Sequence, residues 1–280
     1  MQYSQDISSA FKSNNPILKD RYKEFTGKLA SFADEVKSDR LEILNFSEIE
    51  RKCQIIKQKA AELKSKASKF YVLGTGGASL CGQALCGLKE GGYSKVEFLD
   101  NIDPKTKESL LEKVDLSQSF FIVISKSGRT IETLSQFLVM LDFCKKKEIE
   151  PKDKFLVITD GDNDKNRIRN IAEGLEIEII EHEKVGGRFS IFTNVGLLPA
   201  ALCEVEIEKI LLGAREELHG FYDNPLGSKA LEGAAVSHLL VEKGYTSTVM
   251  MPYIDRFKNF SNWWCQIWAE SLGKTDDVLT

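Results

Sequence analysis

Apolar residues in the first part of the chain recur at helical spacing. Two groups of apolar residues recur at steps of three and four residues, as the buried face of an α-helix requires: Ile43, Leu44, Phe46 and Ile49, and then Ile55, Ile56, Ala60 and Leu63. The polar positions between them are rich in lysine, and no run typical of a strand interrupts them. The pattern predicts a helical segment over residues 1–68.

Short apolar runs begin near residue 69 and alternate with stretches of helical length. Each run has four or five residues, and the runs cover 70–73, 96–99, 120–124, 155–158 and 177–180. A stretch such as 130–147, which separates two of them, is long enough for a helix. This alternation predicts an α/β domain over residues 69–205, with a doubly wound parallel sheet between two layers of helices.

The remaining residues, 206–280, are expected to be mainly helical. Apolar spacing predicts helices at 207–219, 228–243 and 256–272. A further helix is predicted just before this segment, at 191–203, with a local break at Pro199. One further strand is predicted at 246–251, and Pro252 ends it. Because a strand needs partners for its backbone groups, we interpret residues 206–280 as an incomplete second α/β domain.

Composition narrows the function classes. The chain has 38 basic and 42 acidic residues and a net charge of −4, which argues against a nucleic-acid binder. Its apolar runs fall far short of the ~20 residues of a membrane helix. Six scattered cysteines and three histidines lack disulfide or metal-ligand spacing. We therefore expect a cytoplasmic protein with no metal, no membrane partner and no nucleic-acid partner.

A glycine-rich loop, Gly-Thr-Gly-Gly-Ala-Ser at 74–79, follows the first predicted strand. Glycines at such a turn let backbone amides approach an anion at the start of a helix. The dinucleotide fingerprint requires a third glycine where Ser79 stands, although Asp100 ends the next strand. The loop by itself leaves three interpretations open: a tight structural turn, an anion site or a dinucleotide site.

A second loop, at 125–133, is richer in candidate chemistry. It follows the apolar run 120–124 directly and carries four hydroxyls and two cations in the residues where a helix begins: Ser125, Lys126, Ser127, Arg129, Thr130 and Thr133. Hydroxyls, backbone amides and the helix dipole suit a phosphate monoester. The alternative is an N-cap, which needs a single hydroxyl, so the excess favours a binding loop. No Walker A spacing is present.

Together with three further motifs, these loops resemble the glucose-6-phosphate isomerase family, which has the SIS (sugar isomerase) fold. The further motifs are Asn-Ile-Asp at 101–103, Val-Gly-Gly-Arg-Phe-Ser at 185–190 and Glu-Ser-Leu-Gly-Lys at 270–274. The resemblance spans about residues 50–274 in the family's order. It departs from the family at Ala78 and Cys81, where serine and glycine are usual.

The resemblance implies an aldose–ketose isomerase that interconverts glucose 6-phosphate and fructose 6-phosphate through a cis-enediol, without a cofactor. It implies that Glu270 is the catalytic base and that Arg188 lies beside the developing enediolate. The substrate-binding residues it implies are Gly76, Gly77, Ala78, Ser79, Ser125, Lys126, Ser127, Gly128, Arg129, Thr130, Thr133 and Gln266.

The family continues beyond the motif that ends at Lys274, and its intact members are homodimers. The resemblance therefore implies that this chain is truncated at its C-terminus, without a histidine that the partner subunit donates and without a C-terminal lysine. The alternatives are a non-catalytic sugar-phosphate-binding module, an inactive fragment and, with less support, a nicotinamide-dependent oxidoreductase.

Overall fold

The computed structural model describes residues 4–12, 19–38, 41–161 and 165–274. Contacts divide the chain into two units, which are described separately. Unit 1 comprises residues 1–48, 209–249 and 268–280, and unit 2 comprises residues 49–208 and 250–267. These units cross the sequence-based division into 1–68, 69–205 and 206–280, which remains a prediction about domains.

Unit 2 contains a sheet of five parallel strands in the order β2-β1-β3-β4-β5. Its strands are β1 (Lys69–Leu73), β2 (Val96–Leu99), β3 (Ser119–Ser125), β4 (Phe155–Thr159) and β5 (Glu178–Glu181). Phe70 pairs with Val96 on one side and with Phe120 on the other. The predicted α/β class and all five predicted strand positions are confirmed.

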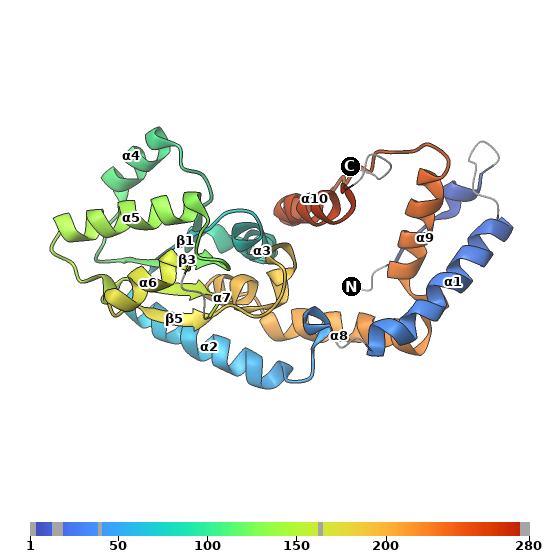
Figure 1. Cartoon of the computed structure of the whole chain (residues 1–280), viewed down its shortest axis with the longest axis horizontal. Helices are drawn as coiled ribbons and strands as arrows, with labels where there is room; N and C mark the ends of the chain where they lie inside the picture. Colours follow the sequence, from blue (N-terminus) through green and yellow to red (C-terminus); the bar gives the residue numbers. More distant parts are fainter. Residues whose placement is uncertain (1–3, 13–18, 39–40, 162–164, 275–280) are drawn as a thin grey trace. The chain divides into compact units, whose positions relative to one another are not determined.

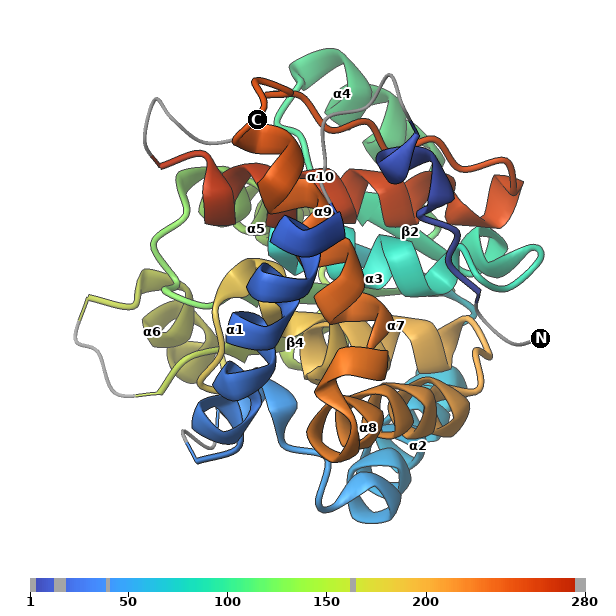
Figure 2. The ribbon, with the colours of Figure 1, turned by 90° about the vertical axis from the view of Figure 1, so that its right-hand side faces the viewer.

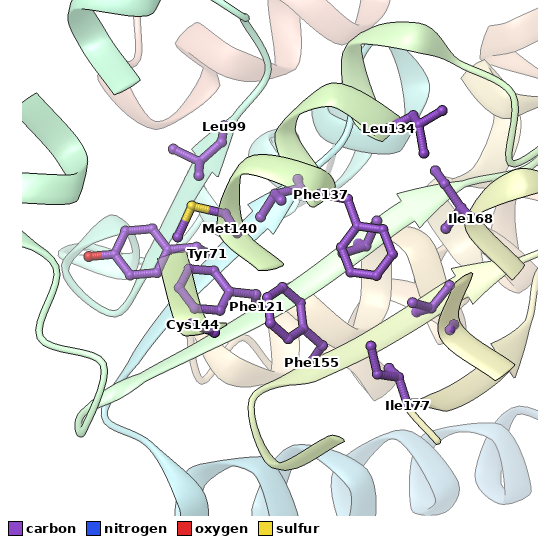
Figure 3. Close-up of a cluster of buried hydrophobic side chains, with 14 of the residues drawn as sticks. Tyr71, Leu99, Phe121, Leu134, Phe137, Met140, Cys144, Phe155, Ile168 and Ile177 are labelled. Atoms are coloured by element: carbon purple, nitrogen blue, oxygen red, sulfur yellow. The ribbon is translucent and has the colours of Figure 1, made fainter. Parts of the chain in front are cut away.

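The central strands are apolar between their end residues because both faces of the sheet are covered. Successive side chains point to opposite faces. Tyr71, Phe121 and Phe155 point to one face and stack on one another, with ring centroids 5.5 and 5.0 Å apart. Figure 3 shows this cluster, to which α5 adds Phe137 and Met140.

Helices cover the two faces of the sheet. α5 lies on one side and α2 on the other (Figure 1), and α7 packs against both α2 and α3. The helices of the sheet-bearing unit are α2 (Ile49–Lys66), α3 (Gly77–Cys86), α4 (Pro104–Lys113), α5 (Ile131–Lys146), α6 (Arg167–Gly174) and α7 (Asn194–Leu202), with short 3-10 turns η3 (Gly92–Ser94), η4 (Pro151–Asp153) and η5 (Gly187–Phe192).

Unit 1 is helical. It is built from α1 (Lys19–Ser38), most of α8 (Ile207–Asp223) and α9 (Lys229–Val241), with short turns η1 (Ser8–Phe11), η2 (Glu42–Leu44) and η6 (Pro225–Gly227). α1 and α9 lie side by side (Figure 2). Phe25 stacks on His238 with ring centroids 4.4 Å apart, and Arg21 pairs with Glu242 at 3.1 Å.

Two expectations for the later part of the chain are wrong. Residues 246–251 form no strand, and Val249 and Met251 are 72% and 64% exposed. No described segment pairs with them, and backbone groups without a ladder partner turn to water instead. The break expected at Pro199 is also absent, because α7 continues through it.

The last helix, α10 (Lys258–Leu272), follows the turn η7 (Asp255–Phe257) and is shared between the two units. The helices of the described ranges include none with the length and apolar character that a membrane crossing requires.

Candidate functional site

The strand order reverses direction between β1 and β3. From β1 the chain moves outward to β2 and then returns across β1 to β3. Connections that leave neighbouring strands toward opposite faces open a crevice at the carboxyl ends of the strands. Here the glycine-rich loop (74–79) follows β1, and the loop 125–133, called the hydroxyl-rich loop below, follows β3. The topology therefore brings the two candidate loops together.

A cavity of about 340 Å³ opens at this point. Eight sequence-predicted residues line it: Gly77, Ala78, Ser125, Lys126, Ser127, Arg129, Thr130 and Thr133. Six further residues line it that were not predicted for the site: Thr75, Ile124, Asp160, Asn166, His182 and Gly187. The cavity lies within unit 2, and its size suits a small polar ligand.

Hydroxyls and amides gather where β3 passes into α5. The Ser125 hydroxyl donates to the Thr130 hydroxyl at 3.3 Å, and the amide of Arg129 donates to the Ser127 hydroxyl at 3.3 Å. Thr133 is 1% exposed, and its hydroxyl has no hydrogen-bond partner within the described ranges. A buried hydroxyl without a partner is costly, and a ligand oxygen in this cavity would relieve that cost.

Two cations that differ in exposure line the cavity. Lys126 is half-buried, and its ammonium donates to the carbonyl of Val185 at 2.9 Å. Arg129 is exposed. Both lie beside the start of α5, whose first-turn amides point out of the helix and carry partial positive charge. This end of the cavity therefore attracts an anion such as a phosphate group.

The backbone of the hydroxyl-rich loop is held by Thr159 and Asn166. The Thr159 hydroxyl donates to the carbonyl of Ser125 at 2.7 Å, and the side-chain amide of Asn166 donates to the Thr159 hydroxyl at 2.8 Å. Asn166 also caps α6, because its side-chain oxygen accepts from the amide of Arg169 at 2.9 Å. One buried asparagine thus connects the cap of α6 to the loop that follows β3.

Gly128 is required by this arrangement. Its φ is +60°, and a Cβ added there would lie 1.5 Å from Oδ1 of Asn166. Any other residue at position 128 would have a strained backbone conformation, and its side chain would displace Asn166. Gly128 therefore contributes to the site by allowing close approach; it is not among the residues found to line the described cavity.

The glycine-rich loop meets the Gly-Gly-Arg motif directly. A Cβ added at Gly77 would lie 2.2 Å from the carbonyl oxygen of Gly187. Ala78 lines the cavity, whereas Ser79 is buried and its hydroxyl accepts from the side-chain amide of Gln83 at 2.8 Å. Of the two neighbouring residues, Ala78 is the one that faces the cavity, and Ser79 is held within α3.

Gln266 approaches this loop from α10. A Cβ added at Gly76, whose φ is +56°, would lie 2.8 Å from Nε2 of Gln266. The same helix is attached to the Gly-Gly-Arg motif, because Trp263 Nε1 donates to the carbonyl of Arg188 at 2.9 Å. The Arg188 guanidinium lies over the ring of Phe189, 4.7 Å from its centroid. Neither Gln266 nor Arg188 is among the described residues that line the cavity.

Glu270 follows Gln266 by one turn of α10. Its side chain is exposed, and it belongs to unit 1. In the described ranges, no cluster of three or more His, Cys, Asp or Glu side chains has the arrangement of a metal site.

Sequence reasoning did not include three polar residues of the cavity wall. Asp160 and His182 directly follow β4 and β5, so their position after a predicted parallel strand was a usable signal. Asn166 precedes a helix and carries only the weaker signal of a capping residue. His182 is 4% exposed, and its pKa is lowered first by burial and further by the nearby charge of Lys126.

Comparisons with known proteins identify the family of the chain. The sequence model of the phosphoglucose isomerase family matches residues 47–278. A glucose-6-phosphate isomerase of Carboxydothermus hydrogenoformans is 36% identical over 274 residues, which cover 91% of this chain and 58% of that protein. One of Methanocaldococcus jannaschii is 37% identical over 216 residues, which cover 75% of this chain and 51% of that protein.

Solved structures are similar over most of the chain. A hypothetical protein from Thermus thermophilus superposes with a TM-score of 0.82 at 27% identity, over 92% of this chain and 64% of that one. A glucose-6-phosphate isomerase from Chlamydia trachomatis gives a TM-score of 0.70 at 24% identity, over 80% of this chain and 44% of that one. The chain thus spans less than two thirds of the length of each of these relatives.

Proposed function

The chain belongs to the phosphoglucose isomerase family, and on that premise we propose that it binds glucose 6-phosphate and fructose 6-phosphate and interconverts them. The observation that carries the proposal is the cavity between β1 and β3, which joins a hydroxyl-rich loop, a helix N-terminus and two cations. The alternative is a sugar-phosphate-binding module without turnover.

We assign the substrate phosphate to the loop that follows β3. Ser125, Ser127, Thr130 and Thr133 offer hydroxyls to its oxygens, and Lys126 offers charge. The buried Thr133 hydroxyl, which has no partner among the described residues, supports this assignment. Hydrogen bonds from hydroxyls and amides to a charged oxygen are stronger than those between neutral groups.

We assign proton transfer to Glu270. Its carboxylate removes the proton from C2 of the open-chain aldose and returns it to C1, while the carbonyl moves from C1 to C2. The intermediate is an enediol whose developing negative charge needs a fixed cation or donor. Arg188 suits this role because a guanidinium keeps its charge at all relevant pH values. Gln266 suits a hydroxyl of the sugar, since its amide faces the glycine-rich loop.

We also propose a homodimer and a cytoplasmic location for the protein. The family resemblance supports both.

A coupled assay with the variant Glu270→Gln tests the proposed function. The amide keeps the size of the side chain and cannot accept the substrate proton, so we expect kcat to fall by about 10²–10⁴-fold, with the dissociation constant for fructose 6-phosphate nearly unchanged. The matched control is Glu216→Gln, at an exposed position of α8. Calorimetric binding without conversion by the unaltered chain would favour the binding module, and the absence of binding would refute both.

A further inference from the structure

His182 occupies a position in the cavity wall to which the proposed chemistry assigns no role. It follows β5, and its backbone amide donates to the carbonyl of Thr159 at 2.8 Å. The residue is 4% exposed and lines the same cavity as Ser125 and Lys126. A buried imidazole therefore lies at the edge of the sheet where the phosphate loop begins.

The hydrogen bonds of the ring define its tautomer. Nδ1 lies 2.6 Å from the backbone carbonyl oxygen of Glu183. A carbonyl oxygen can only accept, so Nδ1 carries a proton, and in the neutral ring Nε2 holds the lone pair. The described ranges contain no hydrogen-bond partner for Nε2.

Charged groups from several segments surround the ring. Lys126, in the loop after β3, opposes a positive charge on the imidazole, while Asp160, after β4, and Glu183, after β5, favour one. The Glu183 carboxylate is held by Lys52 of α2 at 2.9 Å. Arg129 lines the same cavity. Burial is the largest influence and lowers the pKa of His182; the hydrogen bond to the carbonyl of Glu183 opposes this shift, and the charge of Lys126 adds to it.

A phosphate monoester changes this balance, because it carries a charge of about −1.5 to −2 at neutral pH. Opposite charge within a few ångströms favours the protonated imidazole. A protonated Nε2 is a donor to a phosphate oxygen, whereas the lone pair of the neutral ring repels it. We propose that His182 is an additional ligand of the substrate phosphate and takes up one proton when the dianion enters the cavity.

The consequence is an affinity that depends on pH. Where His182 is neutral in the free chain and protonated in the complex, lowering the pH by one unit tightens binding by up to tenfold. This pH dependence disappears above the pH at which His182 loses its proton in the complex as well as in the free chain. At low pH the gain in affinity is limited because the phosphate itself takes up a proton near its second pKa, about 6. We therefore expect tighter binding as the pH falls from 8 toward 6.5.

This inference rests on the proposed sugar-phosphate site, and calorimetry on the full chain can separate the two. Glucose 6-phosphate is titrated at pH 7.5 in buffers of different ionisation enthalpy, which gives the number of protons taken up on binding. Sulfate serves as a second probe, because it stays dianionic throughout this range and any proton uptake then belongs to the protein.

His182→Asn removes Nε2 while its amide retains a donor near the place of Nδ1, and His182→Gln is the second variant in case the first does not fold. His219→Asn, at an exposed position of α8, is the matched control. We expect uptake of up to one proton in the unaltered chain and in the control, and none in the His182 variants, whose affinity falls about tenfold at pH 6.5.

Proton magnetic resonance provides an independent readout, because the chain has three histidines. Addition of glucose 6-phosphate at pH 7 should move the ring signal that is missing from the His182 variants toward the protonated position. Binding with equal proton uptake in the unaltered chain and the His182 variants would overturn the inference and leave the proposed function standing. Failure of glucose 6-phosphate and sulfate to bind would overturn both.

Discussion

At the scale of single residues, the site depends on positions where a side chain is absent as much as on those where one is present. Gly77 allows the start of α3 to approach the carbonyl of Gly187, and Gly128 leaves room for Asn166. Thr133 presents a buried hydroxyl to the cavity. These residues place oxygens and amides along the wall of one cavity.

Gly128→Ala tests the closest of these contacts. The new methyl group would meet Oδ1 of Asn166 at 1.5 Å, and φ of +60° strains any residue with a Cβ. We expect the free energy of unfolding, measured by urea denaturation, to fall by about 1–3 kcal/mol. Gly174→Ala, where a Cβ meets open space, should change it by about 0.5 kcal/mol or less. Equal stability of the two variants would show that Asn166 does not occupy the space beside residue 128.

At the scale of elements, the site is assembled by the ends of strands and the starts of helices. Sequence patterns located these ends well, because apolar runs of four or five residues are typical of strands buried on both faces. The predicted run at 96–99 coincides with β2, and the run at 120–124 differs from β3 by one residue at each end. The strand predicted at 246–251 was wrong, because its apolar residues had no neighbouring strand to pair with.

Asn166→Asp separates the two roles of the α6 cap. A carboxylate still accepts from the amide of Arg169, so the helix keeps its cap. It loses the amide donor to Thr159 and brings negative charge into the cavity wall. We expect the dissociation constant for glucose 6-phosphate to rise about ten- to hundredfold, as one nearby like charge opposes the phosphate.

The control for this prediction is Asn170→Asp, the same substitution at an exposed position of the same helix. Its dissociation constant for glucose 6-phosphate should stay within about twofold of that of the unaltered chain, since an exposed charge outside the cavity is screened by water and salt. If the two variants bind equally, Asn166 does not contribute to the anion site.

At the scale of the whole molecule, the two units differ in how much they bury. Unit 2 has a continuous aromatic and aliphatic cluster on one face of its sheet, and all seven residues of β3 are buried. In unit 1, the described cluster around Ala10 and Leu239 is small. Opening free energies generally follow the local density of buried apolar contacts.

Hydrogen exchange should therefore distinguish the units. Amides of α1 and α9 are expected to exchange through local opening at lower free energy than those of β3 and β4, whose opening approaches global unfolding. Exchange followed by mass spectrometry, with peptides that cover 19–38 and 119–125, measures the difference. Comparable protection of the two peptides would contradict the expected difference in stability between the units. Binding of glucose 6-phosphate should add protection at 125–133.

The sequence by itself determined the parallel α/β sheet and located the hydroxyl-rich loop after β3, because both follow from local patterns: continuous apolar runs, and hydroxyls clustered where a strand meets a helix. Tertiary structure alone decided that Asn166 holds this loop, that His182 lines the same cavity and that Ala78, not Ser79, faces it. Such contacts join segments that are distant in the chain, and their geometry depends on how strands and helices pack rather than on neighbouring residues.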